Sequence, residues 1–390
     1  MYAATKGIVL PTTITGSLPR PSWYTENLGR RSFNEAMIGA HFREQYTDAV
    51  SAFLRDQETA GLDICTDGDC RFDLDVGGYS WFGYPLYHMK GFEIDDSEVP
   101  QGGRRAGMTR GRILHEGLEA RVMPNVVGPI GRGALQYTAL WKCAQRLTER
   151  PVKFGTISAE RIALSLRDKF YNDRRALMMA IATALNEELH ELADAGCPAI
   201  QIEEPQIHLM SARSEQSEIT HDFLVDLFNT TVRGLRAKTE VWCHSCWGNP
   251  AQQRMFAEAQ SYAPVLAVYD RLDADIITFE NCASNGMDLE AFGKSIHDKK
   301  VAVGVIDHHT LQVETPEQVA AMVRAALKHI PAERLVLSTD CGMGREGMSR
   351  RHAFYKTVAI VVGTNAVRKE LGLPEARCLA AEEKMSLAKV

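Results

Sequence analysis

Two hydrophobic patterns alternate along the chain. Short apolar runs, rich in β-branched residues, end in a glycine or a polar residue, and longer stretches with apolar residues every three to four positions follow most of them. The short runs predict buried strands and the longer stretches predict amphipathic helices. The candidate strands, in chain order, are Leu10–Gly16, Leu62–Asp67, Val122–Val127, Val152–Thr156, Ala199–Glu203, Val241–His244, Ile276–Glu280, Val301–Ile306 and Leu335–Thr339.

Two of the predicted helices have clear ends. Residues Arg174–Ala195 place four leucines and an isoleucine on one face, and Gly196 follows as a C-terminal cap. Thr315 is a predicted N-cap, with a proline at the next position and Gln318 at the third helical position. This signature predicts a helix that runs to His329.

Strands that alternate with helices indicate parallel pairing through right-handed crossovers. Eight such units over this length predict a (β/α)₈ TIM barrel, with a doubly wound sheet as the alternative. One candidate strand is in excess, so Val122–Val127 is assigned, with the glycine-rich segment Tyr79–Gly111, to a hairpin or loop excursion after the second strand. We expect one catalytic barrel over residues 1–375 and a C-terminal tail over residues 376–390.

Composition narrows the choice of partners and compartment. A net charge of −6 without a basic block argues against nucleic acid as a partner. Because no apolar run is as long as a membrane span and the N-terminus lacks a signal-peptide core, we expect no membrane association and a cytoplasmic location. Nine scattered cysteines fit a reducing compartment. A homo-oligomer stays open.

Metal-ligating side chains stand at the ends of three predicted strands. His244 and Cys246 are two residues apart, so they project from the same face of an extended strand. Glu280 and Cys341 end two further strands. Since the carboxyl ends of barrel strands meet on one face, and these are all zinc ligands, we predict one Zn²⁺ ion held by His244, Cys246, Glu280 and Cys341.

Cys243 and Cys246 also form a Cys-x-x-Cys pair, which is typical of redox or local structural zinc sites. Residues three apart face opposite sides of a strand, which disfavours that interpretation. A zinc ion with two thiolates, a carboxylate and a neutral imidazole has a net negative charge, so it activates water poorly. Such an ion suits the binding of a substrate thiol as a nucleophilic thiolate, and we predict alkylation of that thiolate.

These motifs resemble the catalytic barrel of cobalamin-independent methionine synthase. The similarity rests on His244–Cys246, on the strand end at Glu280 and on Asp340–Gly342, and it runs from about Thr12 to about Leu371. It implies a zinc-dependent methyltransferase of methionine biosynthesis that moves a methyl group from a methylated folate to homocysteine or a related thiol.

The resemblance also implies an acceptor site. Gly16 and Ser17 match the segment that holds the substrate carboxylate, and Asp69 and Glu203 match the acids that hold its amino group. The family has Glu at the first of these two acids and Asp at the second, so one side chain is shorter here and the other longer. Phe154–Ala159 departs from the family's Leu-Thr-Gly-Pro-Val-Thr beside the folate, which leaves the donor open.

Asp307-His308-His309 resembles the family's Asp-x-His, which implies that His309 protonates the leaving amine, with Asp307 beside it. Epoxyalkane:coenzyme M transferases share the zinc constellation, and there the acceptor thiol has a sulfonate and the histidine would protonate an alkoxide. A third alternative is a barrel with a structural zinc, or a cofactor-free decarboxylase-like barrel.

Three smaller features have more than one interpretation. Cys282, two residues past Glu280, is a packing residue, a residue that supports the metal ligands, or an alternative ligand. Asp67 and Asp69 are a proton-sharing pair, or acids that are solvated or salt-bridged. The basic group Arg345, Arg350 and Arg351 is a solvated loop or an anion contact.

Overall fold

The computed structural model describes residues 3–28, 31–71, 80–94, 124–203, 206–210, 218–247, 260–344 and 348–382. At its centre is a parallel sheet in the order β1-β4-β6-β7-β8-β9-β10. These strands are β1 (Cys65–Thr66), β4 (Val152–Ile157), β6 (Ala199–Glu203), β7 (Glu240–Ser245), β8 (Ile276–Phe279), β9 (Lys300–Gly304) and β10 (Leu335–Ser338). Neighbouring strands follow one another around the sheet in chain order, as in a (β/α)₈ barrel.

The first predicted strand closes this sheet without becoming a regular strand. Thr12 forms a parallel bridge with Leu337 of β10, and its carbonyl accepts a hydrogen bond from Ile64 N at 3.1 Å, next to β1. Leu10 has a positive φ of 55° and a proline without an N–H follows it, so the ladder cannot extend further back. The segment Leu10–Gly16 thus fills the eighth position, and the predicted (β/α)₈ barrel is confirmed.

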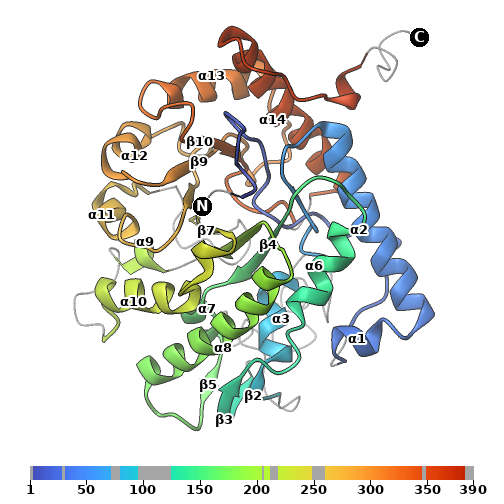
Figure 1. The fold of residues 1–390 in the computed structure, drawn as a ribbon, viewed down its shortest axis with the longest axis vertical. Coiled ribbons are helices and arrows are strands. Elements are labelled where there is room, and N and C mark those ends of the chain that lie inside the picture. Colours follow the sequence, from blue (N-terminus) through green and yellow to red (C-terminus); the bar gives the residue numbers. More distant parts are fainter. Residues whose placement is uncertain are drawn as a thin grey trace, which may run out of the picture.

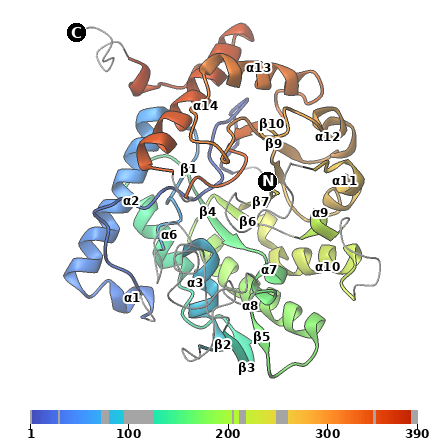
Figure 2. The ribbon, with the colours of Figure 1, turned by 180° about the vertical axis from the view of Figure 1, so that it is seen from behind.

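Helices surround the strands, as Figures 1 and 2 show from opposite sides. The longer ones, α2, α8 and α14, pack around the barrel with shorter helices between them. The helices are α1 (Phe33–Ala36), α2 (Ala40–Ala60), α3 (Ser80–His88), α6 (Tyr137–Gln145), α7 (Ala159–Ala163), α8 (Arg174–Asp194), α9 (Ile207–Met210), α10 (His221–Val232), α11 (Leu266–Tyr269), α12 (Leu289–Ser295), α13 (Pro316–Leu327) and α14 (Arg350–Glu370). Single 3₁₀ turns cover Leu235–Ala237, Ala263–Val265 and Leu379–Ala381.

The two helices with predicted ends match the sequence signals. α8 ends one residue before the predicted Ala195, and Gly196 has the positive φ of 99° that favours glycine. Thr315 and Gln318 form the predicted capping box of α13. This helix ends at Leu327, two residues before the predicted end.

The excursion after the second strand is a small separate sheet, seen at the bottom of Figure 1. β2 (Lys90–Glu93) pairs antiparallel with β3 (Asn125–Gly131), and β3 pairs parallel with β5 (Arg167–Asp168). The discarded candidate Val122–Val127 overlaps β3, outside the barrel sheet as predicted. Tyr79 and residues 95–111 of the predicted excursion lie outside the described residues.

The amino ends of the strands are sealed by the N-terminal segment. Thr5 Oγ1 donates to Glu240 Oε2 at 2.8 Å and accepts from Lys300 Nζ at 2.9 Å. Trp242, fully buried inside the barrel, donates its Nε1–H to Glu240 Oε1 at 2.8 Å. Buried polar groups at this end therefore satisfy one another.

The described part of the predicted tail, residues 376–382, packs against the barrel. Asn365 Nδ2 of α14 donates to Ala376 O at 2.7 Å, and Asn365 Oδ1 accepts from Ala376 N at 2.9 Å. The domain boundary at residue 375 stays a prediction. Among the described residues, no helix is both long and apolar enough to cross a membrane.

Candidate functional site

Three of the four predicted metal ligands meet at the carboxyl ends of the strands. Ligand atoms of His244, Cys246 and Cys341 all lie within 4.8 Å of one another, and the three side chains are buried. The two sulfur atoms are 3.3 Å apart. A nitrogen and two sulfur atoms at this spacing fit the ligands of a metal ion.

The His244 ring is oriented by a neighbouring strand. Its Nδ1 lies 2.5 Å from Thr278 Oγ1 of β8, the residue paired with it in the parallel register. Its Nε2 is buried and has no hydrogen-bond partner in the described part of the chain. Buried polar atoms rarely stay unpaired, so this nitrogen fits a metal ligand whose other nitrogen is fixed by a hydrogen bond.

The fourth predicted ligand, Glu280, lies beside this cluster. A carboxylate oxygen of Glu280 and a ring nitrogen each of His308 and His309 lie within 4.8 Å of one another. The four predicted ligands are therefore found as a cluster of three with Glu280 next to it. Trp247 N donates to Glu280 Oε2 at 2.8 Å and holds the carboxylate there, while Oε1 is buried without a partner among the described residues. Burial, with the nearby Asp340, raises the pKa of Glu280 to about 9, as expected for an acid lacking a compensating cation.

Asp340 ties the last ligand strand to the turn after Glu280. Its carboxylate accepts hydrogen bonds from three consecutive backbone N–H groups, Asn281 and Cys282 at 2.8 Å and Ala283 at 2.7 Å. Cys282 is thereby held through its backbone, and the metal-competent clusters found among the described residues do not include its thiol. Sequence reasoning used Asp340 only as part of a motif.

A histidine that was not predicted from the sequence hydrogen-bonds to the backbone of Cys246. His208 Nε2 lies 2.7 Å from the Cys246 carbonyl, and Nδ1 lies 2.9 Å from Tyr269 Oη and 3.0 Å from Ser245 Oγ. Burial lowers the pKa of His208 to about 3, so the ring is neutral and donates from Nε2. It sits on the four-residue helix α9, too short for a periodic signal.

The two predicted acceptor acids converge on a pair of glycines. A methyl group added at Gly16 would lie 2.8 Å from Asp69 Oδ2 and 3.4 Å from Glu203 Oε1. At Gly155 it would lie 2.5 Å from Glu203 Oε1. The missing side chains therefore leave a place between two carboxylates that suits a small cation.

Buried cations that were not predicted border the same acids. Arg71 forms a 2.6 Å ion pair with Asp69. Lys153 Nζ donates to Gln201 Oε1 at 2.7 Å, and Gln201 Nε2 donates to Glu203 Oε1 at 2.8 Å. Burial raises the pKa of Asp69 and lowers the pKa of Lys153 to about 7. Neither cation was recognisable from spacing, because each sits singly in an apolar or loop context.

Ser17 connects the acids to the metal ligands. Its carbonyl accepts from Met343 N at 2.8 Å, and its hydroxyl accepts from Gly344 N at 3.2 Å. A Cβ at Gly342, directly after Cys341, would come within 2.1 Å of Ser17 Oγ. The Gly16–Ser17 segment therefore runs between the acid pair and the predicted metal centre.

The predicted proton donor lies on the loop after β9. Asp307 Oδ1 accepts from His309 N at 2.7 Å and lies 3.0 Å from His309 Nδ1. Burial raises the pKa of Asp307, but the hydrogen bonds from His309 outweigh it and the pKa is lowered. An ionised Asp307 therefore fixes one ring nitrogen of His309, and the His308 ring lies 3.9 Å away.

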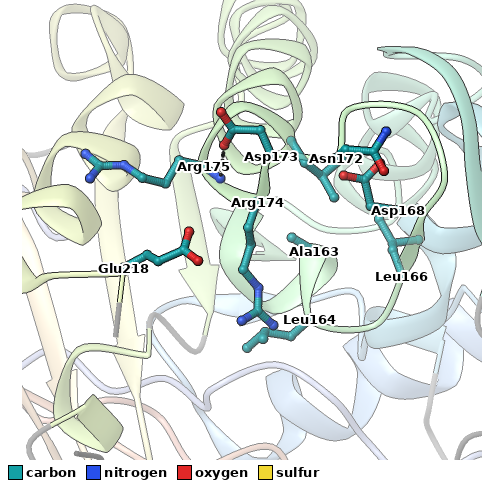
Figure 3. Close-up of a pocket in the computed structure, with 10 residues that line it drawn as sticks. Ala163, Leu164, Leu166, Asp168, Asn172, Asp173, Arg174, Arg175 and Glu218 are labelled. Carbon is teal, nitrogen blue, oxygen red and sulfur yellow. Dashed lines mark hydrogen bonds between the residues drawn. The ribbon is translucent and has the colours of Figure 1, made fainter. Parts of the chain in front are cut away.

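The basic residues singled out in the sequence are not placed at this site by the structure. Arg350 forms a bidentate pair with Asp56 of α2, at 2.6 and 3.0 Å, and Arg345 lies outside the described residues. A separate cavity of about 760 Å³ lies between α7, the start of α8 and Glu218 (Figure 3). None of the predicted site residues lines it, and its Asp173 is occupied as the cap of α8.

Comparisons with known proteins give the family of the chain. The model of the cobalamin-independent synthase catalytic domain matches residues 103–361, more than half of the chain. The chain belongs to this family. Methionine synthase from Saccharolobus solfataricus is 29% identical over 364 residues, covering 93% of this chain and 96% of its own, and that from Sulfurisphaera tokodaii is 27% identical over 365 residues, covering 93% and 94%. The resemblance predicted from the motifs is confirmed.

Solved structures of the family have the same fold. The B12-independent methionine synthase of a Shewanella species, in complex with selenomethionine, aligns with a TM-score of 0.74 at 27% identity, covering 93% of this chain and 99% of its own. A putative vitamin-B12 independent methionine synthase from Listeria monocytogenes aligns with a TM-score of 0.63 at 17% identity, covering 91% and 96%. The second likeness concerns the fold alone.

Proposed function

We propose that this protein is a methyltransferase of the cobalamin-independent methionine synthase type, which transfers a methyl group to the thiol of homocysteine or a closely related amino acid. The observation that carries the proposal is one juxtaposition. The nitrogen and two sulfur ligands at His244, Cys246 and Cys341 lie at one end of the Gly16–Ser17 segment, and the Asp69–Glu203 acid pair lies at the other. An amino acid thiol would use both, the metal ligands for its sulfur and the acid pair for its ammonium group.

The donor atoms fit a zinc ion. His244, Cys246 and Cys341 would hold it, with Glu280 as the fourth ligand beside them. A bound zinc ion supplies one kind of chemistry here: it lowers the pKa of a substrate thiol, so that the sulfur is a thiolate at neutral pH. The unpaired His244 Nε2 and Glu280 Oε1 support this assignment.

Charge favours an acceptor with an amino group. Around the acid pair, the buried acids Asp67, Asp69 and Glu203 outnumber the buried bases Arg71 and Lys153, with which they interact, by one. A substrate ammonium would supply the missing positive charge, whereas a sulfonate would add a negative one. The Shewanella relative was solved with selenomethionine, an amino acid with such an ammonium group. These observations favour homocysteine over coenzyme M.

The chain's own residues then have the following roles. Asp69 and Glu203 bind the ammonium, and Gly16 with Ser17 binds the carboxylate. The acceptor sulfur forms a bond to the methyl carbon of the methylated folate, and the carbon–nitrogen bond breaks with its electron pair on nitrogen. His309 gives that nitrogen a proton. The thiol releases one proton when it becomes a thiolate, so the numbers of protons taken up and released are equal. Asp307 keeps His309 oriented.

A thiol screen on the metal-loaded protein tests the proposal. Cobalt(II) substituted at the site reports thiolate binding through its absorption spectrum, and homocysteine is compared with coenzyme M and with small thiols. We expect stoichiometric metal and a spectral change with homocysteine at the lowest concentration. A preference for coenzyme M would favour epoxide chemistry. Metal that responds to no thiol would indicate a structural site and would overturn the proposal.

A further inference from the structure

A buried lysine sits behind the loop that carries His309. Lys356 of α14 is completely buried, and its Nζ lies within hydrogen-bond distance of four acceptors. They are the two carboxylate oxygens of Glu314 at 3.0 and 2.9 Å, the Asp307 carbonyl at 3.0 Å and the Gln312 carbonyl at 2.6 Å. All four belong to the segment between β9 and α13.

The contacts continue from this lysine to the imidazole. Glu314 Oε1, which accepts from Lys356, also accepts from Asp307 N at 2.9 Å. The Asp307 side chain in turn accepts from the backbone and faces the ring of His309. Directly after Glu314, the capping box at Thr315 begins α13. The loop is thus fixed at both ends and at its middle.

The charges explain why the lysine is needed. The backbone N–H of Asp307 donates to the Glu314 carboxylate. Lys356 forms an ion pair with the same carboxylate and donates to the backbone carbonyl of Asp307. A fully buried ammonium is costly unless it is paired and hydrogen-bonded, and here its protons have acceptors. Without it, the Glu314 carboxylate would lose its cation, and the carbonyls of residues 307 and 312 would lose their donor.

We propose that Lys356 and Glu314 are positioning residues for His309. They hold the loop from the outer, helical side, so that the imidazole stays beside Glu280 at the mouth of the barrel. The catalytic part of this inference rests on the proposed function, in which His309 protonates the leaving group. The structural part, that the pair orders residues 307–314, is independent of the reaction.

The test uses Lys356→Met in the full-length, metal-loaded protein. Hydrogen exchange of the peptide covering residues 307–314 should become faster, while exchange elsewhere in the barrel stays the same. Turnover with a methylated folate should fall at least about tenfold, because a displaced general acid loses its contribution. Turnover with a methyl sulfonium donor, whose leaving group needs no proton, should change less than about twofold.

Arg324→Met is the matched control. Arg324 of α13 pairs with Glu370 of α14 at 2.9 Å, so it too is a cation paired with an acid between α14 and a preceding segment, but neither residue belongs to the 307–314 segment. We expect it to change neither exchange in that segment nor the ratio of the two donors. If Lys356→Met does not fold, Glu314→Gln serves instead, since it keeps the shape and removes the charge.

Two results would overturn the inference. Unchanged exchange at 307–314 in both variants would show that the pair does not order the loop. Faster exchange with an equal loss for both donors would show a general structural role rather than positioning of an acid. His309→Asn, measured with the same two donors, separates these results from a failure of the proposed function, because that failure would remove the donor dependence from His309 itself.

Discussion

The two ends of the barrel treat buried polar groups in opposite ways. At the amino ends of the strands, Thr5, Glu240, Lys300 and Trp242 hydrogen-bond to one another and leave the carboxylate fully engaged. At the carboxyl ends, His244 Nε2 and Glu280 Oε1 are equally buried and have no partner in the described structure. Each of these unpaired atoms costs roughly 1–3 kcal/mol.

The difference indicates that the polar groups at the amino ends contribute to stability, whereas those at the carboxyl ends are candidates for function. Polar groups at the amino ends are paired because they hold the N-terminal segment to the strands. Those at the carboxyl ends are held in place through one atom each, by Thr278 for His244 and by Trp247 for Glu280, and the other ring nitrogen and carboxylate oxygen have no partner among the described residues. The comparison predicts that variants at one end lose function and variants at the other end lose stability.

The largest effect should come from the predicted metal ligands. Cys246→Ser and Cys341→Ser should each lose most of the bound metal and all measurable methyl transfer, yet unfold at nearly the same temperature as the metal-free parent, because the barrel core does not depend on the ion. Metal analysis and thermal unfolding check this. Cys243→Ser is the control, since Cys243 packs in the hydrophobic core. Loss of metal from Cys243→Ser but not from Cys246→Ser would contradict the assignment.

Glu240→Ala should show the opposite phenotype. It leaves Trp242 Nε1 and the Thr5 donors without their acceptor and should lower the free energy of unfolding by about 2–4 kcal/mol, with metal content and turnover retained. Denaturant unfolding measures it. Glu290→Ala, which removes an exposed pair with Lys294, is the control and should leave the denaturation midpoint unchanged. Impaired metal binding in Glu240→Ala would break the comparison.

The acid pair should affect acceptor affinity. Glu203→Gln and Asp69→Asn should each weaken homocysteine binding by about 1.5–3 kcal/mol, or roughly tenfold to 150-fold, because each removes a charged hydrogen-bond acceptor from the ammonium. Thiols without an amine should bind unchanged or better. Titration followed by cobalt absorption measures both. Unaltered homocysteine affinity in both variants would count against an amino acid acceptor.

His309→Asn should act on rate alone. We expect metal content and thiolate formation to be normal and turnover with the folate donor to fall at least about tenfold, within the range for general acids. The deficit should shrink with a methyl sulfonium donor. Single-turnover kinetics with the two donors make the measurement, and equal losses with both would assign His309 a positioning role only.

A smaller, pH-dependent effect sharpens the comparison, because it involves a buried unpaired atom outside the site. His88 Nε2, at the end of α3, has no hydrogen-bond partner within the described residues, and burial lowers the pKa of His88 to about 4. Between pH 6.5 and 4 the unfolded chain therefore binds a proton that the folded chain does not, so stability should fall by about 1 kcal/mol per pH unit as the pH decreases. His88→Phe should lack this share of the slope in denaturant unfolding. Parallel slopes for the two proteins would show that His88 is not the group responsible.

The meeting of His244, Cys246 and Cys341 could be predicted because the ends of strands can be recognised in the sequence. His244, Cys246 and Cys341 each follow an apolar run, and parallel strands bring their ends together whatever the helices between them do. The same logic predicted the barrel and removed Val122–Val127 from it. The first strand was harder, because a left-handed Leu10 and the following proline interrupt the ladder while the segment still fills its place.

Residues that act through tertiary contacts could not be predicted. His208 lies on a short helix, and Lys153 and Lys356 are single lysines that look like surface residues in a linear sequence. Their partners are far away in the sequence: Cys246 is 38 positions from His208, Gln201 is 48 positions from Lys153, and Glu314 is 42 positions from Lys356. The acid pair was named by resemblance, but its closeness to Gly16 and Gly155 depends on three separate segments.

The closure of the barrel by Thr12 and Thr15 has a consequence for how the protein is made. Thr15 N donates to Thr339 Oγ1 at 3.0 Å, and Thr339 O accepts from Thr15 Oγ1 at the same distance, a separation of 324 residues. The Gly16–Ser17 segment is synthesised more than 300 residues before the end of β10, so it cannot take its place between β1 and β10 until β10 has followed. Nascent chains released before β10 would therefore bear unpaired strand edges at both sides of the gap, and they are the species that we expect chaperones to meet.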